Sequence, residues 1–181
     1  MQIELGIIIA GSFAVVALLG WLIYRRWFKR TPLEQLVRDI SYEKVVNVFL
    51  PDGLGGEIHI DHLLLTPRGL LLLDTKDVSG TVFAGDRLDE WSANSAQGRV
   101  TFDNPLPQLQ DRVAAIRQLV PGTPIESKVM FIDRVDFPKG HPEAVTTVEM
   151  LAAEFGEAPL SEEGGVYGAA WETIATSARP I

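Results

Sequence analysis

The sequence predicts an α/β fold, in which helices flank a mixed central sheet and one transmembrane helix precedes it. Three observations lead to this class. A long uncharged segment opens the chain, segments with helix and strand periodicity alternate after it, and an aliphatic hairpin lies near the middle. The 181 residues suffice for one domain with a real core plus an appendage. We expect three parts: an anchor with a basic stop (1–30), a domain (31–156) and an acidic C-terminal segment with a short helix (157–181).

The N-terminal part is predicted to be a single-pass membrane anchor. Residues 5–24 carry no charge, and 20 residues are the length that a hydrocarbon core of ~30 Å requires. A buried helix of a soluble core rarely stays uncharged for so long. The basic segment "RRWFKR" follows directly, and only Glu4 precedes the apolar stretch, which is the reverse of a cleaved signal peptide. The positive-inside rule then places the C-terminal domain in the cytoplasm.

Charge and cysteine content restrict the function of the remaining chain. Residues 1–30 carry four basic side chains against Glu4, a balance of +3, so the total of −8 leaves −11 for residues 31–181. A protein that binds nucleic acid non-specifically normally presents a basic surface. Any nucleic-acid role therefore has to come from a local site. The absence of cysteine excludes disulfides, thiolate zinc sites and cysteine nucleophiles.

The segment before the hairpin begins with a predicted helix. Thr31 and Pro32 are a typical helix start, with threonine as the N-cap and proline in the first turn. Apolar residues then follow at helical spacing, namely Leu33, Leu36, Val37 and Ile40. The stretch "YEKVVNVFLP" is expected to be a strand or the end of a second helix. The glycine-rich "DGLGG" after it indicates a loop.

Strands and helices also alternate after the hairpin. Short strands are expected within 79–93 and 98–104, and the apolar run at 127–135 predicts a buried strand. A helix is predicted from about Pro107 to Leu119, closed by a proline–glycine pair. Residues 144–156 indicate a strand end and a short helix capped by Thr146 or Thr147. A last helix is expected near 167–178.

The hairpin "EIHIDHLLLTPRGLLLLDTKD" contains an aspartate in each of its aliphatic strands. If the turn is centred on Pro67 and Arg68, this register sets Asp61 opposite Asp74. It also sets Lys76 on the same face as the two aspartates. Like charges directly opposite one another destabilise a sheet, and a buried carboxylate pair costs several kcal/mol unless a positive charge lies between its members.

A divalent cation bound between the two aspartates would compensate this charge. Carboxylate ligands suit Mg²⁺ or Mn²⁺, and Lys76 beside the ion would orient or deprotonate a water molecule. The alternative is a solvated hairpin end, in which both aspartates are ordinary surface residues. From the pattern alone these two interpretations stay open, because the register is itself an assumption.

The ordered set of motifs resembles the nuclease-related domain (NERD) family of restriction-endonuclease-like nucleases. Asp61 followed by Asp74-Thr75-Lys76 resembles the acid…acid-x-lysine core of that superfamily, and "IDHLLLTPRGLLLLDTKDVSG" resembles the longer family motif. Trp91 and "FDNPLPQ", which matches an asparagine-proline-x-x-glutamine motif, follow in order. The resemblance covers about residues 33–135. The family more often has glutamate at the position of Asp74 and glycine at that of Leu33.

The resemblance implies a restriction-endonuclease-like fold and a function. Asp61 and Asp74 would be the metal ligands, and Lys76 would position or activate water. Glu34 would support the metal or the water, and Gln108 would contact the active site from the second helix. We therefore expect a membrane-anchored nuclease that requires Mg²⁺ or Mn²⁺ and acts on nucleic acid. DNA is expected as the substrate in preference to RNA. The alternative is an inactive nuclease-fold module that serves as a membrane-tethered binding or scaffold protein.

Other conspicuous residues are interpreted as structural. His62 faces away from Asp61 and is expected to pack, and Trp91 is expected to pack at a strand edge rather than to stack on a base. Asn104 is expected to cap the helix that presents Gln108. His59 is expected on the same face of the hairpin as Asp61 and Asp74, but without a second nitrogen ligand a zinc site is not expected. Neither a phosphate-binding loop nor a nucleophile elbow is present, which argues against nucleotide hydrolysis and esterase activity.

Overall fold

The computed structural model describes residues 32–155 and 166–180, and the chain divides into two compact units, residues 1–35 and 36–181. The first helix, α2 (Pro32–Ile40), begins at the proline that the sequence marks as a helix start. The predicted anchor at residues 5–24 lies outside the described residues. In the part of the chain that is described, no helix is long and apolar enough to cross a membrane.

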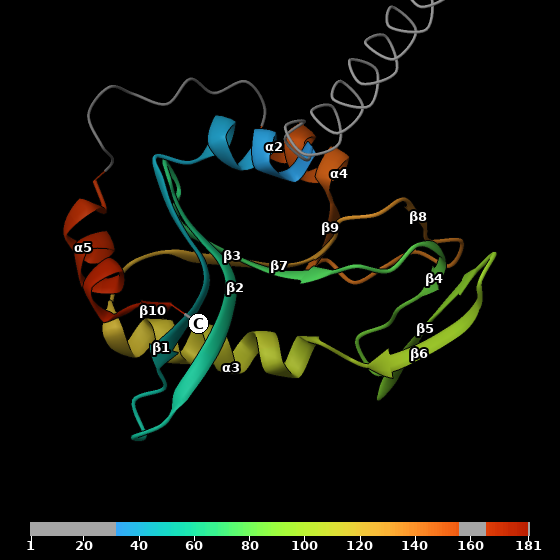
Figure 1. The fold of residues 1–181 in the computed structure, drawn as a ribbon, viewed down its shortest axis with the longest axis horizontal. Helices are drawn as coiled ribbons and strands as arrows, with labels where there is room; N and C mark the ends of the chain where they lie inside the picture. Colours follow the sequence, from blue (N-terminus) through green and yellow to red (C-terminus); the bar gives the residue numbers. More distant parts are fainter. Residues whose placement is uncertain (1–31, 156–165, 181) are drawn as a thin grey trace, which may run out of the picture. The chain divides into compact units, whose positions relative to one another are not determined.

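The larger unit is built on a mixed six-stranded sheet (Figure 1). The strand order is β10-β1-β2-β3-β7-β9, in which β3 and β7 are parallel, β7 and β9 are parallel, and the other pairs are antiparallel. The strands are β1 (Glu43–Pro51), β2 (Glu57–Thr66), β3 (Gly69–Lys76), β7 (Ile125–Phe131), β9 (Val145–Thr147) and β10 (Arg179–Pro180). The segment left open between strand and helix end is therefore a strand, β1.

A second sheet of four strands lies beyond the end of β3, whereas the sequence suggested a single central sheet. Its order is β6-β5-β4-β8, with β4 (Gly80–Phe83), β5 (Glu90–Ser95), β6 (Gly98–Asp103) and β8 (Val135–Asp136). The chain enters this sheet at Gly80, which has φ +99° and packs so closely on the Asn94 carbonyl that a side chain would collide with it. This close approach lets the chain leave one sheet and start the other.

Helices cover both faces of the six-stranded sheet, as predicted (Figure 1). α3 (Leu106–Leu119) lies on one face, and α4 (Val148–Phe155) lies on the other. α5 (Gly168–Ser177) packs beside β1. The core on the α3 side joins the helix to β2 and β3 through fully or nearly fully buried aliphatic side chains, which include Leu63, Leu65, Leu70, Leu72, Leu109, Val113 and Ile116.

The β2–β3 hairpin forms the centre of this sheet. Leu70 to Leu73 are at most 1% exposed, because helices cover both faces of β3, and a strand covered on both sides is continuously apolar. The register runs from Thr66 opposite Gly69 to His62 opposite Leu73. This is the register predicted from the turn at Pro67 and Arg68, so the hairpin prediction is confirmed as far as the ladder extends.

Candidate active site

The hairpin ladder ends one step before the two aspartates. The last pair is His62 with Leu73, and from there β3 continues alone along β7 as far as Lys76. Asp61 and Asp74 are therefore not a regular cross-strand pair, although they follow the last pair on the two strands. The difference has a local cause, because the Asp61 carboxylate takes the place of a strand partner for the backbone of β3.

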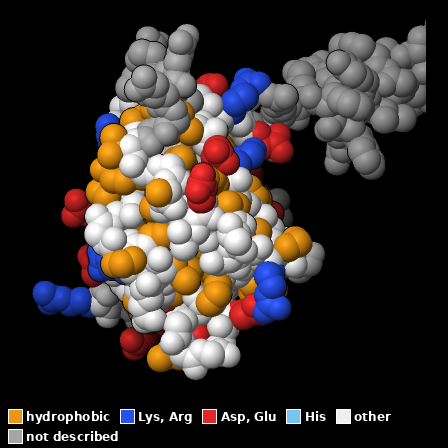
Figure 2. All heavy atoms as spheres, turned by 90° about the vertical axis from the view of Figure 1, so that its left-hand side faces the viewer, with side chains coloured by type: hydrophobic (Ala, Val, Ile, Leu, Met, Phe, Trp, Pro, Cys, Tyr) orange, Lys and Arg blue, Asp and Glu red, His pale blue; other side chains and the backbone are white. Residues whose placement is uncertain are grey.

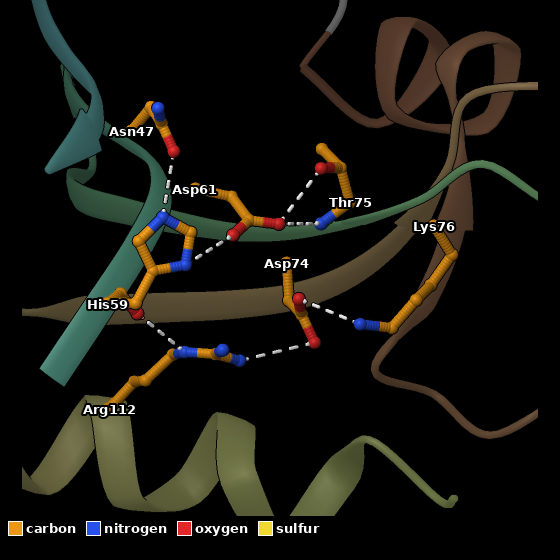
Figure 3. Close-up of polar contacts among 7 residues, drawn as sticks. All are labelled: Asn47, His59, Asp61, Asp74, Thr75, Lys76 and Arg112. Atoms are coloured by element: carbon orange, nitrogen blue, oxygen red, sulfur yellow. Dashed lines mark hydrogen bonds and ion pairs between the residues drawn. The ribbon is translucent and has the colours of Figure 1, made fainter. Parts of the chain in front are cut away.

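Asp61 is held by Thr75 (Figure 3). Its Oδ2 accepts hydrogen bonds from the Thr75 N–H at 2.8 Å and from the Thr75 hydroxyl at 2.9 Å. Burial would raise the pKa of Asp61, but these two bonds and the positive charges of Arg112 and His59 outweigh burial, so the pKa lies below its ordinary value. Asp61 is consequently a fixed anion whose second oxygen, Oδ1, points away from Thr75.

Asp74 is the most buried polar group of the site, with 2% of its surface exposed. The Lys76 ammonium donates to its Oδ1 at 3.0 Å, and Nη1 of Arg112 lies 3.3 Å from its Oδ2 (Figure 3). The Arg112 contact is an ion pair without hydrogen-bond geometry. Within the described part of the chain, Oδ2 and Nη1 therefore make no hydrogen bond. The ion pair with Arg112 is thus the described contact of this buried oxygen, and its hydrogen-bonding capacity is unused.

His59 and Asn47 border Asp61 on the other side. His59 Nδ1 lies 3.2 Å from Asp61 Oδ1, and His59 Nε2 lies 2.9 Å from the Asn47 side-chain oxygen. Asn47 has φ +55° and is the one non-glycine with a positive φ among the described residues. The β1–β2 pairs on either side of it are regular, and the pair of Asn47 with Asp61 is skipped. Both ladders therefore open at Asp61.

The structure brings three of the five predicted site residues to neighbouring positions: Asp61, Asp74 and Lys76. Gln108 lies in the first turn of α3 with an exposed side chain, and none of the described hydrogen bonds joins it to either aspartate. Glu34 lies in the first turn of α2, in the N-terminal unit. Its role and that of Gln108 stay predictions.

Arg112 is the main residue that sequence reasoning missed. It reaches from α3 to Asp74, and its Nε donates to the His59 carbonyl at 2.8 Å, across 53 residues of sequence. One signal pointed to it, because Arg112 follows Gln108 by four residues and so lies on the same helix face. Asn47 had a weaker signal, as a polar residue within a strand. Thr75 stands between two predicted site residues and was overlooked.

The donor set suits a hard divalent ion. Mg²⁺ is typically bound by one or two carboxylates, with water and phosphate oxygens as further ligands. Asp74 offers a buried oxygen without a hydrogen bond, and Asp61 offers Oδ1. In the described residues no group of three or more histidine, aspartate or glutamate side chains is arranged to hold a metal by itself. Any such ion would therefore depend on two carboxylates and on non-protein oxygens.

Three structural interpretations are confirmed. Trp91 is fully buried, and its indole N–H donates to the Gly85 carbonyl at 3.0 Å. The Asn104 side chain accepts the N–H of Leu106, the first residue of α3, at 3.0 Å. His62 is half-buried, and this burial lowers its pKa. None of these three residues contacts the two aspartates through a described hydrogen bond.

Comparisons with known proteins agree with the motif order. A family model described as a nuclease-related domain (NERD) matches residues 24–132, which is more than half of the chain. An uncharacterized protein of Bacillus anthracis is 25% identical over 80 residues, which make up 44% of this chain and 38% of that protein. The chain therefore corresponds to well under two thirds of that relative. No solved structure matches the chain significantly.

Proposed function

Because the chain belongs to the nuclease-related domain (NERD) family of the restriction-endonuclease-like superfamily, we propose that it is a divalent-metal-dependent nuclease. It would hydrolyse phosphodiester bonds of nucleic acid, with DNA expected as the substrate in preference to RNA. The observation that carries this proposal is Asp74, a buried carboxylate with one oxygen that makes no hydrogen bond, beside Lys76 and next to the strand end that presents Asp61. We propose further that residues 5–24 anchor it in a membrane, with the domain in the cytoplasm.

In this proposal Asp61 and Asp74 would hold the ion with their carboxylates. Thr75 contributes by holding Asp61 Oδ2, which fixes the direction of the other oxygen. A bound Mg²⁺ or Mn²⁺ supplies Lewis acidity toward the phosphodiester and lowers the pKa of a coordinated water. A ligand pair that is already oriented loses little conformational entropy when the ion binds.

The two cations of the site have different tasks. The Lys76 side chain is one-quarter exposed and its ammonium contacts Asp74, so it would orient the attacking water or stabilise charge on the phosphate. Arg112 is more buried, with 13% of its side chain exposed, and its Nε donates a hydrogen bond to the His59 carbonyl. Arg112 therefore positions Asp74, whereas Lys76 is the candidate catalytic residue.

Metal binding tests the proposal through thermal unfolding of the full chain with and without Mn²⁺. An ion that binds only the folded state at a hundred times its dissociation constant stabilises it by about 2.7 kcal/mol. We expect Tm to rise with Mn²⁺ for the parent and to stay unchanged for Asp61→Asn, which keeps the size of the side chain and an acceptor for Thr75. An equal rise in both proteins would exclude Asp61 as a ligand.

A specific observation favours the alternative, an inactive membrane-tethered binding module. Asp74 already has two cationic neighbours, Lys76 and Arg112, so its charge is compensated without an ion. The acidic balance of residues 31–181 supports the same alternative. On the face drawn in Figure 2, Lys and Arg side chains are scattered and form no basic patch. If Mn²⁺ shifts the Tm of neither protein, this alternative holds.

A further inference from the structure

The outer strand of the four-stranded sheet has an open edge. β6 pairs with β5 from Glu90 opposite Asp103 to Ser95 opposite Gly98, and no other described strand adjoins it. A two-residue loop closes this hairpin, and in such a ladder the inward and outward backbone groups alternate. The N–H and C=O groups of Arg99, Thr101 and Asp103 therefore point outward, away from β5.

β6 lacks most of the features that usually protect an edge strand. It contains no proline and no lysine, and its register with β5 is continuous, without a bulge. Its two charged side chains, Arg99 and Asp103, are of opposite sign, so they do not repel a second copy of the strand. Val100 in its middle is 54% exposed. Monomeric proteins normally block such an edge, because it can pair with another chain.

We propose that β6 is a homodimer interface, in which it pairs antiparallel with β6 of a second copy about a two-fold axis at Thr101. The sequence Arg99-Val100-Thr101-Phe102-Asp103 is complementary to itself in this arrangement. Arg99 faces Asp103 of the second copy, twice, and Val100 faces Phe102 of the second copy, twice. Opposite charges and apolar residues at facing positions each stabilise a strand pair.

The charge pattern selects this register. A two-fold axis shifted by one residue would set Arg99 opposite Thr101 or Pro105 and would leave Asp103 without a basic neighbour. In the register centred on Thr101, the outward backbone groups of the three odd-numbered residues face one another, as an antiparallel ladder requires. Charge and backbone pairing therefore favour the same arrangement.

A second observation inside the monomer points to the same partner. Glu90 and Asp103 are directly opposite each other in the β5–β6 ladder, and like charges at facing positions destabilise a sheet. None of the described ion pairs involves either carboxylate. In the dimer, Arg99 of the second copy joins this row beside Asp103, on the same face, and offsets the repulsion.

The shared surface is a single strand, smaller than the interfaces of permanent dimers, so the association is reversible. Cross-linking detects such a dimer. The chain contains no cysteine, so Thr101→Cys introduces one thiol at the two-fold axis. The matched control is Ala96→Cys, an exposed residue in the loop of the same hairpin. In the proposed dimer the two loops point in opposite directions, far beyond the reach of a short bismaleimide.

The full chain in mild detergent should give severalfold more cross-linked dimer with Thr101→Cys than with Ala96→Cys. Equal yields would overturn the proposal. Charge exchange then tests the register. Arg99→Asp or Asp103→Arg, each added to Thr101→Cys, should lower the yield severalfold, because each sets like charges at facing positions.

Mixing the two charge variants should restore cross-linking between them, and the double variant Arg99→Asp/Asp103→Arg should restore it within one preparation. A variant that fails to fold cannot recover in this way, so recovery separates pairing from damage. If neither mixture nor double variant recovers the yield, or if single charge changes leave it unaltered, β6 is not the interface.

Discussion

At the scale of single residues, Arg112 connects three elements. From α3 it contacts Asp74 on β3 and the His59 carbonyl on β2. Removing one member of a buried ion pair leaves an uncompensated charge. We predict that Arg112→Met lowers the free energy of unfolding by about 3 kcal/mol, measured by urea denaturation.

Arg112→Lys separates the charge of Arg112 from its geometry. Lysine keeps the cation but lacks the fork that reaches both partners, so we expect a smaller loss. Arg117→Met is the matched control, because Arg117 is an exposed arginine on the same helix and should change stability by less than about 0.5 kcal/mol. A loss for Arg117→Met as large as that for Arg112→Met would show that the site contacts are not responsible.

Asp61 gives a prediction for pH. Its pKa in the folded protein is depressed, chiefly by Thr75 against the opposing effect of burial, so the ionised form stabilises the fold. This contribution is present above the pKa of the unfolded chain and is lost as pH falls through the folded pKa. Between about pH 5 and pH 2, the parent should therefore lose more stability than Asp61→Asn. Identical acid-unfolding profiles would contradict this account.

At the scale of elements, the turn between β2 and β3 depends on Gly69. This residue has φ +122°, and a Cβ there would collide with the Pro124 carbonyl, which accepts the Leu70 N–H at 2.9 Å. Gly98 has nearly the same φ, +123°, but a Cβ added to it would meet no atom within 4 Å. The two glycines therefore separate backbone strain from crowding.

We predict that Gly98→Ala costs about 1 kcal/mol from strain alone, and that Gly69→Ala costs clearly more because of the collision. Chemical denaturation of both variants measures the difference. Equal losses would mean that the contact with Pro124 relaxes freely, and that the turn is held by its own residues only.

The hairpin was predictable because its register is set locally. A two-residue turn between aliphatic runs determines which residues face each other, and the pairs from His62–Leu73 to Thr66–Gly69 follow the prediction. The helix at 106–119 was predictable from the proline–glycine pair that closes it, and the helix at 168–177 lies where a last helix was expected. The second sheet was not, because β4 pairs with β8, a two-residue strand far along the chain that carries no periodicity of its own.

The candidate site was predictable only in part, for the same reason. Asp61, Asp74 and Lys76 belong to one hairpin, so their proximity follows from local register. The approach of Arg112 depends on how α3 packs against the sheet, and the opening of both ladders at Asp61 depends on a side chain replacing a strand partner. The spacing of Arg112 from Gln108 indicates its helix face but not how the helix packs, and the opening of the ladders has no pattern in the sequence.

At the scale of the whole molecule, the net negative charge of residues 31–181 disfavours binding of the proposed nucleic-acid substrate. A phosphate backbone is repelled by a surface of net charge −11, so binding would rely on the ion and on Lys76. A membrane anchor would restrict the protein to nucleic acid near the membrane. Pairing through β6 would bring two such domains together.

Cleavage of DNA by the full chain in Mn²⁺ tests the central claim most directly. The parent should cleave, and Asp74→Ala and Lys76→Ala should lose activity by about 100-fold or more, because each removes a group needed to bind the ion or stabilise the reacting phosphate. Asp111→Ala, which removes an exposed aspartate beside Arg112, should retain it. An Asp74→Ala protein that binds Mn²⁺ and cleaves DNA as well as the parent would contradict the account.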